Sequence, residues 1–98
     1  MDESIIRGTE VKFLMTATGF DMNSDYFVIT VNCGGISKDF AKPELTFDAE
    51  SGDWFLCFDT TPFRSGVMTA TVTAYVPDDD FPDGLRTEKT SRVLGKIK

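Results

Sequence analysis

The chain has 98 residues, of which 41% are hydrophobic and 27% are charged, a composition typical of a globular protein. This length allows one compact core, so we expect residues 1–98 to form a single domain. Sixteen acidic and ten basic residues give a net charge of -6, so the sequence predicts no binding to nucleic acid phosphates. No histidine and only two cysteines are present, which excludes the usual zinc sites and an imidazole-activated nucleophile, and we expect no catalytic, cofactor or metal-binding residues.

The start of the chain, Met1-Asp2-Glu3-Ser4, is acidic. It lacks the basic region and the apolar stretch of a secretory signal. Apolar runs elsewhere are far shorter than the roughly 20 residues that a membrane helix needs. We therefore expect the protein to be made and kept in the cytoplasm, with no membrane partner.

The first half of the chain shows apolar side chains at every second position, which is the period of a β-strand. Residues 11–17 and 26–33 have this alternation. The second segment ends in Gly34-Gly35, and two glycines between extended segments predict a two-residue hairpin turn in which both have positive φ. Residues 36–40 are then the returning strand.

Proline and a second polar turn separate the next strands. Pro43 favours a short edge strand at residues 45–47, because proline cannot donate to a sheet ladder. Residues 48–53 have the composition of a turn. Residues 54–58 are apolar on both faces, with Trp54 and Leu56 on one of them, so we expect the core on one side and a neighbouring loop or partner on the other.

The clearest strand covers residues 67–76, where Met68, Val72 and three other apolar residues alternate with threonines and a tyrosine. A loop with four aspartates follows, and residues 85–97 form a charged last strand with a break near Gly95. With a short strand near Ile5 the total is seven or eight strands, at the spacing of an all-β sandwich or barrel. Helical pieces, if any, are single turns in the 20s or around Pro62.

The aspartate loop contains Asp78, Asp79, Asp80 and Asp83. Hard cations bind closely spaced carboxylates, but the spacing does not fit a helix-loop-helix calcium site, so a solvated loop is the favoured interpretation. The polar segment at residues 21–25 is likewise expected to be a turn rather than a recognition loop. Cys33 and Cys57 are expected to be two buried thiols, and a disulfide requires their strands to face each other.

Charge is distributed unevenly along the chain. Residues 39–84 carry ten acids and two bases, whereas residues 85–98 carry five bases and one acid. This basic strand is either a solvated edge or a surface that docks one copy of the protein on another, or on a second acidic surface. Phe63 and Phe81 lie in loops, where an exposed aromatic ring would contact a partner. The candidate interface consists of Phe63, Phe81, Arg86, Lys89 and Arg92.

The order of features resembles the immunoglobulin-like modules of tailed-phage structural proteins. The resemblance rests on Ile6-Arg7-Gly8, the strand from Glu10 to Thr18, the Gly-Gly hairpin, the turn Glu50-Ser51-Gly52-Asp53, Asp59-Thr60-Thr61, Ser65-Gly66 and Tyr75-Val76-Pro77-Asp78. It is similar in particular to the N-terminal module of upper-baseplate proteins. The resemblance implies an immunoglobulin-like antiparallel β-sandwich of about seven strands, without enzymatic activity, that attaches to other virion proteins.

The resemblance also implies a place for the protein in the virion. No coiled coil or repeat that would form a fibre is present. The leading hypothesis is a capsid auxiliary (decoration) subunit that binds the major capsid protein of the head shell, with no small-molecule substrate. The alternatives are an adaptor module of the tail or baseplate, and a carbohydrate-binding β-sandwich, for which exposed aromatic side chains on one face would be the evidence.

Overall fold

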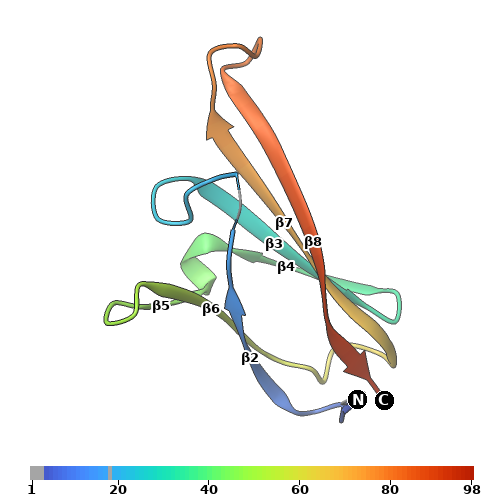
Figure 1. Ribbon diagram of the computed structural model, residues 1–98. Helices are drawn as coiled ribbons and strands as arrows, with labels where there is room; N and C mark the ends of the chain where they lie inside the picture. The colour runs from blue at the N-terminus through green and yellow to red at the C-terminus, as the bar shows by residue number, and fades with distance from the viewer. Residues whose placement is uncertain (1–3, 18) are drawn as a thin grey trace.

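The computed structural model describes residues 4–17 and 19–98, in which eight strands and one turn of 3-10 helix form two sheets. Sheet A has the order β1 (Ser4–Ile5), β8 (Leu85–Ile97), β7 (Gly66–Pro77), β3 (Tyr26–Cys33) and β4 (Ile36–Ala41). Sheet B has the order β2 (Glu10–Met15), β6 (Asp53–Asp59) and β5 (Thr46–Asp48), and the 3-10 turn is η1 (Lys42–Glu44). The expectation of an all-β, two-sheet fold is confirmed (Figure 1).

The strand boundaries agree closely with the sequence pattern. The predicted strands at residues 26–33 and 85–97 have the observed bounds of β3 and β8. β2 ends at Met15, two residues earlier than predicted. The predicted places for a helical turn, in the 20s or around Pro62, are wrong, because the one helical turn of the described residues lies at Lys42–Glu44. The predicted acidic start at residues 1–3 and the predicted strand end at Thr18 lie outside the described residues. Each strand pair is antiparallel except β1 with β8, which is parallel.

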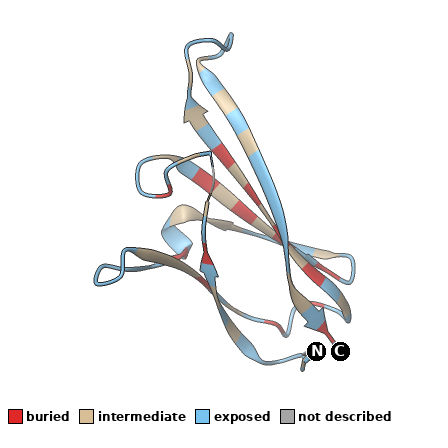
Figure 2. Cartoon of the chain, viewed as in Figure 1, coloured by how far each residue is buried: buried red, intermediate tan, exposed pale blue. Residues whose placement is uncertain are grey.

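The core lies between the two sheets, and β7 supplies its centre. Met68, Ala70, Val72 and Ala74 are buried and alternate with half-buried threonines, as the sequence predicted. Figure 2 shows the buried positions gathered in β3 and β7, whereas β8 is mostly exposed. Phe58 of sheet B contacts Phe40 of sheet A, with ring centroids 5.4 Å apart, so aromatic packing joins the layers.

The hairpin between β3 and β4 confirms the predicted turn. Gly34 and Gly35 have φ values of 62° and 83°, a conformation that glycine adopts without steric cost. A Cβ atom at Gly34 would lie 2.5 Å from the Cβ of Arg64. The backbone of the β6–β7 connection therefore approaches this turn closely, and glycine is required there for space as well as for φ.

β7 and β8 form a long hairpin that extends beyond the rest of the molecule (Figure 1). Met68 pairs with Gly95 and Thr69 with Val93, so Leu94 is an extra residue in β8 and the predicted break near Gly95 is confirmed. The radius of gyration is 14.7 Å. A compact domain of this size has about 13 Å, so the projecting hairpin makes the molecule elongated.

The two cysteines lie on different sheets and are both free. Cys33 is buried, and burial raises the pKa of its thiol. The prediction of a second buried thiol is wrong, because Cys57 points away from the core on the outer face of β6 and is exposed. Among the described residues, no helix has the length and apolar character needed to cross a membrane.

Candidate interaction surface

Four of the five predicted interface residues lie on one structure, which we call the hairpin arm: β7, the loop at residues 78–84, and β8. Arg86, Lys89 and Arg92 are on β8, and Phe81 is in the loop with 44% of its surface exposed. The hairpin arm therefore brings these residues onto one projecting element, although each of them has a different environment.

Phe63 does not belong to this surface, and the prediction that it is an exposed loop residue is wrong. Its side chain has no exposed surface. Its backbone N–H donates to the carbonyl of Thr60, which closes a tight turn and directs the ring into the core. There it packs edge-on against Phe58, with centroids 5.7 Å apart. Phe63 closes the end of the core and is not available to a partner.

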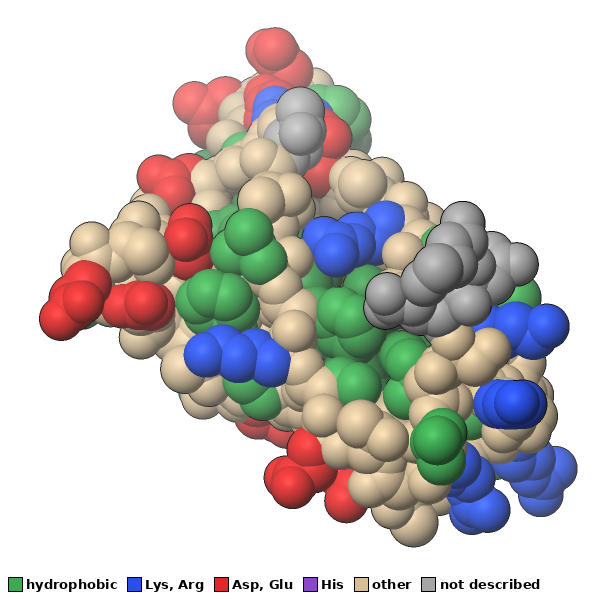
Figure 3. Space-filling model, turned by 60° about the horizontal axis from the view of Figure 1, so that its bottom comes forward, with side chains coloured by type: hydrophobic (Ala, Val, Ile, Leu, Met, Phe, Trp, Pro, Cys, Tyr) green, Lys and Arg blue, Asp and Glu red, His purple; other side chains and the backbone are tan. Residues whose placement is uncertain are grey.

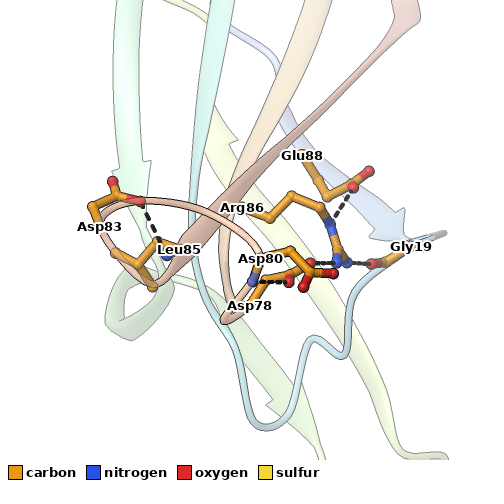
Figure 4. Close-up of polar contacts among 7 residues, drawn as sticks. All are labelled: Gly19, Asp78, Asp80, Asp83, Leu85, Arg86 and Glu88. Atoms are coloured by element: carbon orange, nitrogen blue, oxygen red, sulfur yellow. Dashed lines mark hydrogen bonds and ion pairs between the residues drawn. The ribbon is translucent and has the colours of Figure 1, made fainter.

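Two of the four aspartates of the hairpin loop, Asp78 and Asp83, stabilise the loop itself (Figure 4). Oδ1 of Asp78 accepts the backbone N–H of Asp80 at 3.0 Å, and Oδ1 of Asp83 accepts that of Leu85 at 3.1 Å. The pKa of Asp78 is lowered, first by the bond from Asp80 and then by the guanidinium of Arg86. In the described part of the chain no three acidic, cysteine or histidine side chains are placed to hold a metal ion.

Arg86 is the centre of a polar cluster at the base of the hairpin loop (Figure 4). Nη1 donates to Oδ2 of Asp78 at 2.7 Å, and Nε donates to Oε2 of Glu88 at 2.8 Å. Nη2 also lies 3.4 Å from the carbonyl of Gly19 in the β2–β3 connection. These carboxylates raise the pKa of Arg86. Arg86 therefore connects the hairpin arm to the β2–β3 connection. The sequence suggested a free interface group, whereas the Arg86 side chain is bonded within the chain.

Lys89 and Arg92 lie on opposite faces of β8. Lys89 is exposed on the outer face, opposite Thr73 of β7. Arg92 is on the inner face, opposite buried Ala70, and its Nη1 donates to the carbonyl of Leu14 in β2 at 2.9 Å. Arg92 thus connects the edges of the two sheets. Lys89 is the basic residue of the predicted set whose side chain has no hydrogen bond to the described residues.

The backbone of β8 is unpaired along most of one side. β1 pairs only with Lys96 and Ile97, so residues 85–95 have β7 on one side and no described strand on the other. We call this the β8 edge. Val93, 65% exposed, lies along it. The sequence pattern predicted this strand, but the exposed edge depends on how short β1 is.

The outer face of sheet A carries a pair of exposed aromatic residues that were not among the predicted interface residues. Tyr26 and Tyr75 are cross-strand partners with ring centroids 6.2 Å apart and an interplanar angle of 24°. They are 52% and 39% exposed. Period two does place Tyr75 on the non-core face of its strand, so the signal was present. Its alignment with Tyr26 follows only from the strand register.

The polar loop at residues 21–25 is a turn, as predicted. Oδ1 of Asp21 accepts the backbone N–H of Asn23 at 2.8 Å, and this bond is the first cause of the lowered pKa of Asp21. Oδ1 of Asn23 in turn accepts the indole N–H of Trp54 at 3.0 Å. The loop is therefore fixed to sheet B by its own polar side chains.

The face of the molecule in Figure 3 has an uneven distribution of charge. Acidic side chains lie along its top, left and lower edges, whereas most of the basic side chains lie on the right, and hydrophobic groups lie near the centre. This arrangement agrees with the uneven charge along the sequence.

No family model, no curated protein and no solved structure matches the chain. The resemblance to phage modules therefore stays a prediction.

Proposed function

We propose that this chain is an immunoglobulin-like β-sandwich that serves as a non-enzymatic structural subunit of a tailed-bacteriophage virion. In this role it is a capsid auxiliary subunit, which decorates the head shell by binding the major capsid protein. It is made in the host cytoplasm and ends in the virion.

The strand order supports the immunoglobulin-like part of the proposal. When β2 to β8 are lettered B, C, C′, D, E, F and G, sheet A has the order G-F-C-C′ and sheet B the order B-E-D. A variable-type immunoglobulin domain has C′ beside the G-F-C strands and B-E-D in the opposite sheet. The difference from that pattern is at the start, where β1 lies parallel to β8 and not on sheet B.

The single observation that carries the adhesive role is the hairpin arm. It projects from the body, and it has Phe81 exposed near its end. An exposed aromatic residue on a projecting element is typical of a protein–protein contact. A subunit that binds the folded shell through such an arm stabilises it by mass action.

Co-sedimentation with phage heads assembled without this protein tests the role of Phe81. We expect the wild-type chain to bind and the Phe81→Ser variant to bind at least about tenfold more weakly, since truncating a central aromatic contact costs roughly 2 kcal/mol or more. Phe47→Ser is the matched control, because Phe47 is 45% exposed on the distant β5. Equal binding of the wild type and the Phe81→Ser variant would refute the role of the hairpin arm.

Lys89→Glu tests the electrostatic part of the docking. Lys89 is the cleaner choice, because Arg86 and Arg92 make hydrogen bonds within the chain. We expect the variant to melt like the wild type and to bind heads more weakly at low salt, with the difference fading as salt screens the charge. Lys38→Glu on β4 is the control. Full occupancy by the Lys89→Glu variant at each salt concentration would mean that the basic strand is only a solvated face.

Two other functions can be distinguished by further binding experiments. Binding to purified tails, with none to heads, would favour the tail or baseplate adaptor. The carbohydrate-binding alternative is favoured by Tyr26 and Tyr75, which form an exposed aromatic surface on the outer face of sheet A. Titration with soluble bacterial cell-wall polysaccharide tests it, and binding that is lost in the Tyr26→Ala/Tyr75→Ala variant would replace the head-binding proposal.

A further inference from the structure

The β8 edge is the longest unpaired strand edge that the described residues contain. An edge of this kind presents backbone N–H and C=O groups that pair readily with another strand. We propose that two copies of this chain pair through their β8 edges in antiparallel orientation, with Thr90 of one copy opposite Thr90 of the second. The two five-stranded sheets would then form one continuous sheet of ten strands.

The register follows from charge complementarity. A two-fold axis at Thr90 pairs residues that are equally far from it on either side. Glu88 therefore lies opposite Arg92 of the second copy, and by symmetry Arg92 lies opposite Glu88. Lys89 lies opposite Ser91, and exposed Val93 lies opposite Thr87. Opposite charges are thus matched, and no two like charges face each other.

The two neighbouring registers lose this charge match. Side chains directly opposite each other in an antiparallel pair share a face, so the axis must pass through a residue and not between two. An axis at Lys89 would place Lys89 against its own copy and Arg86 against Arg92. An axis at Ser91 would separate Glu88 from Arg92 and place Arg92 opposite Thr90 and Lys89 opposite Val93, so no charged pair would form within the β8 edge. Thr90 is therefore favoured over both neighbouring centres.

Both charged partners retain bonding capacity for this contact. Arg92 uses Nη1 to reach the carbonyl of Leu14, which leaves further guanidinium N–H groups. Glu88 accepts Arg86 through Oε2, which leaves Oε1. The side chain of Glu88 is 35% exposed, and Arg92 is exposed. The ion pair between copies would therefore add to the contacts within each chain.

The other edges are less suited to pairing with themselves. β4 is six residues long, and an axis at its centre would place Lys38 or Asp39 against its own copy. β2 already has a backbone carbonyl occupied by Arg92, and β5 has three residues. An exposed strand that can pair with itself while matching its charges is found only in β8 among the described strands.

Sedimentation velocity over a concentration series tests the proposal without any phage component. The contact is small, so we expect a dimer with a Kd on the order of 10–100 µM. Arg92→Glu places two carboxylates opposite each other at both ends of the register, and Glu88→Arg places two guanidinium groups there. Each variant alone should dimerise at least about tenfold more weakly. Lys38→Glu should dimerise like the wild type.

Mixing the two variants separates a pairing defect from a folding defect. The Glu88→Arg and Arg92→Glu chains have complementary charges at each contact, so an equimolar mixture should form heterodimers with wild-type affinity. A wild-type protein that stays monomeric to about 1 mM, or a mixture that fails to associate while both variants melt cooperatively, would overturn the proposal. Binding only to another protein, with no self-association, would also overturn it.

A cross-link tests the register directly and does not depend on Glu88. In a Cys57→Ser background, Thr90→Cys would bring two cysteines face to face across the axis, where antiparallel strand spacing lies within the Cα separation of a disulfide. We expect a covalent dimer on mild oxidation at concentrations near the Kd. Lys38→Cys in the same background is the control. Equal or no cross-linking of the two variants would contradict the register.

Discussion

The one fully buried polar side chain among the described residues, that of Thr60, allows a test of how the β1–β2 turn is held to the end of β6. Thr60 has no exposed surface. Its Oγ1 accepts the backbone N–H of Gly8 at 3.0 Å and donates to the carbonyl of Thr9 at 2.8 Å. The backbone N–H of Thr60 also donates to the carbonyl of Thr9 at 3.1 Å. One hydroxyl therefore joins the β1–β2 turn to the end of β6.

Thr60→Val preserves shape and removes the hydroxyl. The carbonyl of Thr9 keeps one donor, whereas the N–H of Gly8 loses its acceptor. An orphaned, partly buried donor costs about 1–3 kcal/mol. For a domain of this size 1 kcal/mol corresponds to about 4–8 °C in Tm, so we expect the Tm to fall by roughly 5–20 °C. Urea unfolding followed by tryptophan fluorescence gives the free energy independently.

Thr69→Val is the matched control, because Thr69 lies on the outer face of β7 and makes no side-chain hydrogen bond to the described residues. The same chemical change there should leave stability within about 0.5 kcal/mol of the wild type. If Thr60→Val unfolds at the same urea concentration as the wild type, the hydroxyl does not hold the turn and the reasoning fails.

Four further predictions follow from the core and the loops. Val72→Asp should abolish the cooperative melt, because an unpaired carboxylate would be buried in the centre of β7, and circular dichroism during heating would reveal a surviving transition. Phe63→Ala should cost about 3–5 kcal/mol in urea unfolding, and a neutral result would contradict its place in the core. Hydrogen bonds to their carboxylates lower the pKa values of Asp21, Asp59 and Asp78. The stability that these groups contribute is therefore present above the ordinary Asp pKa and is lost as the pH falls through the lowered values. We expect the Tm to fall in acid and to stay level from pH 5 to 7. Millimolar calcium or a chelator should leave the Tm unchanged, and a rise of several degrees with calcium would show that the aspartate loop binds it.

The sequence predicted the strands because the alternation of apolar and polar side chains in each strand can be recognised from consecutive residues. The β7 face with Met68 and Val72 and the turn at Gly34-Gly35 were both readable in this way. The assignment of each strand to one of the two sheets could not be predicted, because it depends on contacts between residues far apart in the chain. Phe63 shows the limit clearly: its segment has the composition of a loop, and only the turn closed by Thr60 directs the ring inward.

The environment of Arg86 was closer to being predictable. A hairpin with Pro77 opposite Leu85 places Asp78 beside the start of β8, so the ion pair follows from the register. The acidic loop and the basic strand appear as separate features in the sequence, whereas in the structure Asp78 of the loop pairs with Arg86 of the strand. The exposure of Cys57 was missed for a related reason, since both faces of β6 are apolar and the pattern alone does not say which one is covered.

The unequal size of the two sheets explains why β8 is charged on both faces. Sheet A has five strands and sheet B three, and β2 is the edge of sheet B nearest to β8 through the Arg92–Leu14 bond. Inner positions of β8 that period two would assign to the core hold Glu88, Thr90 and Arg92, because no further strand of sheet B covers them. An apolar strand there would expose its inner face to water. The charges therefore keep the inner face of β8 hydrated where sheet B does not cover it, and their order along the strand is the basis of the proposed pairing with a second copy.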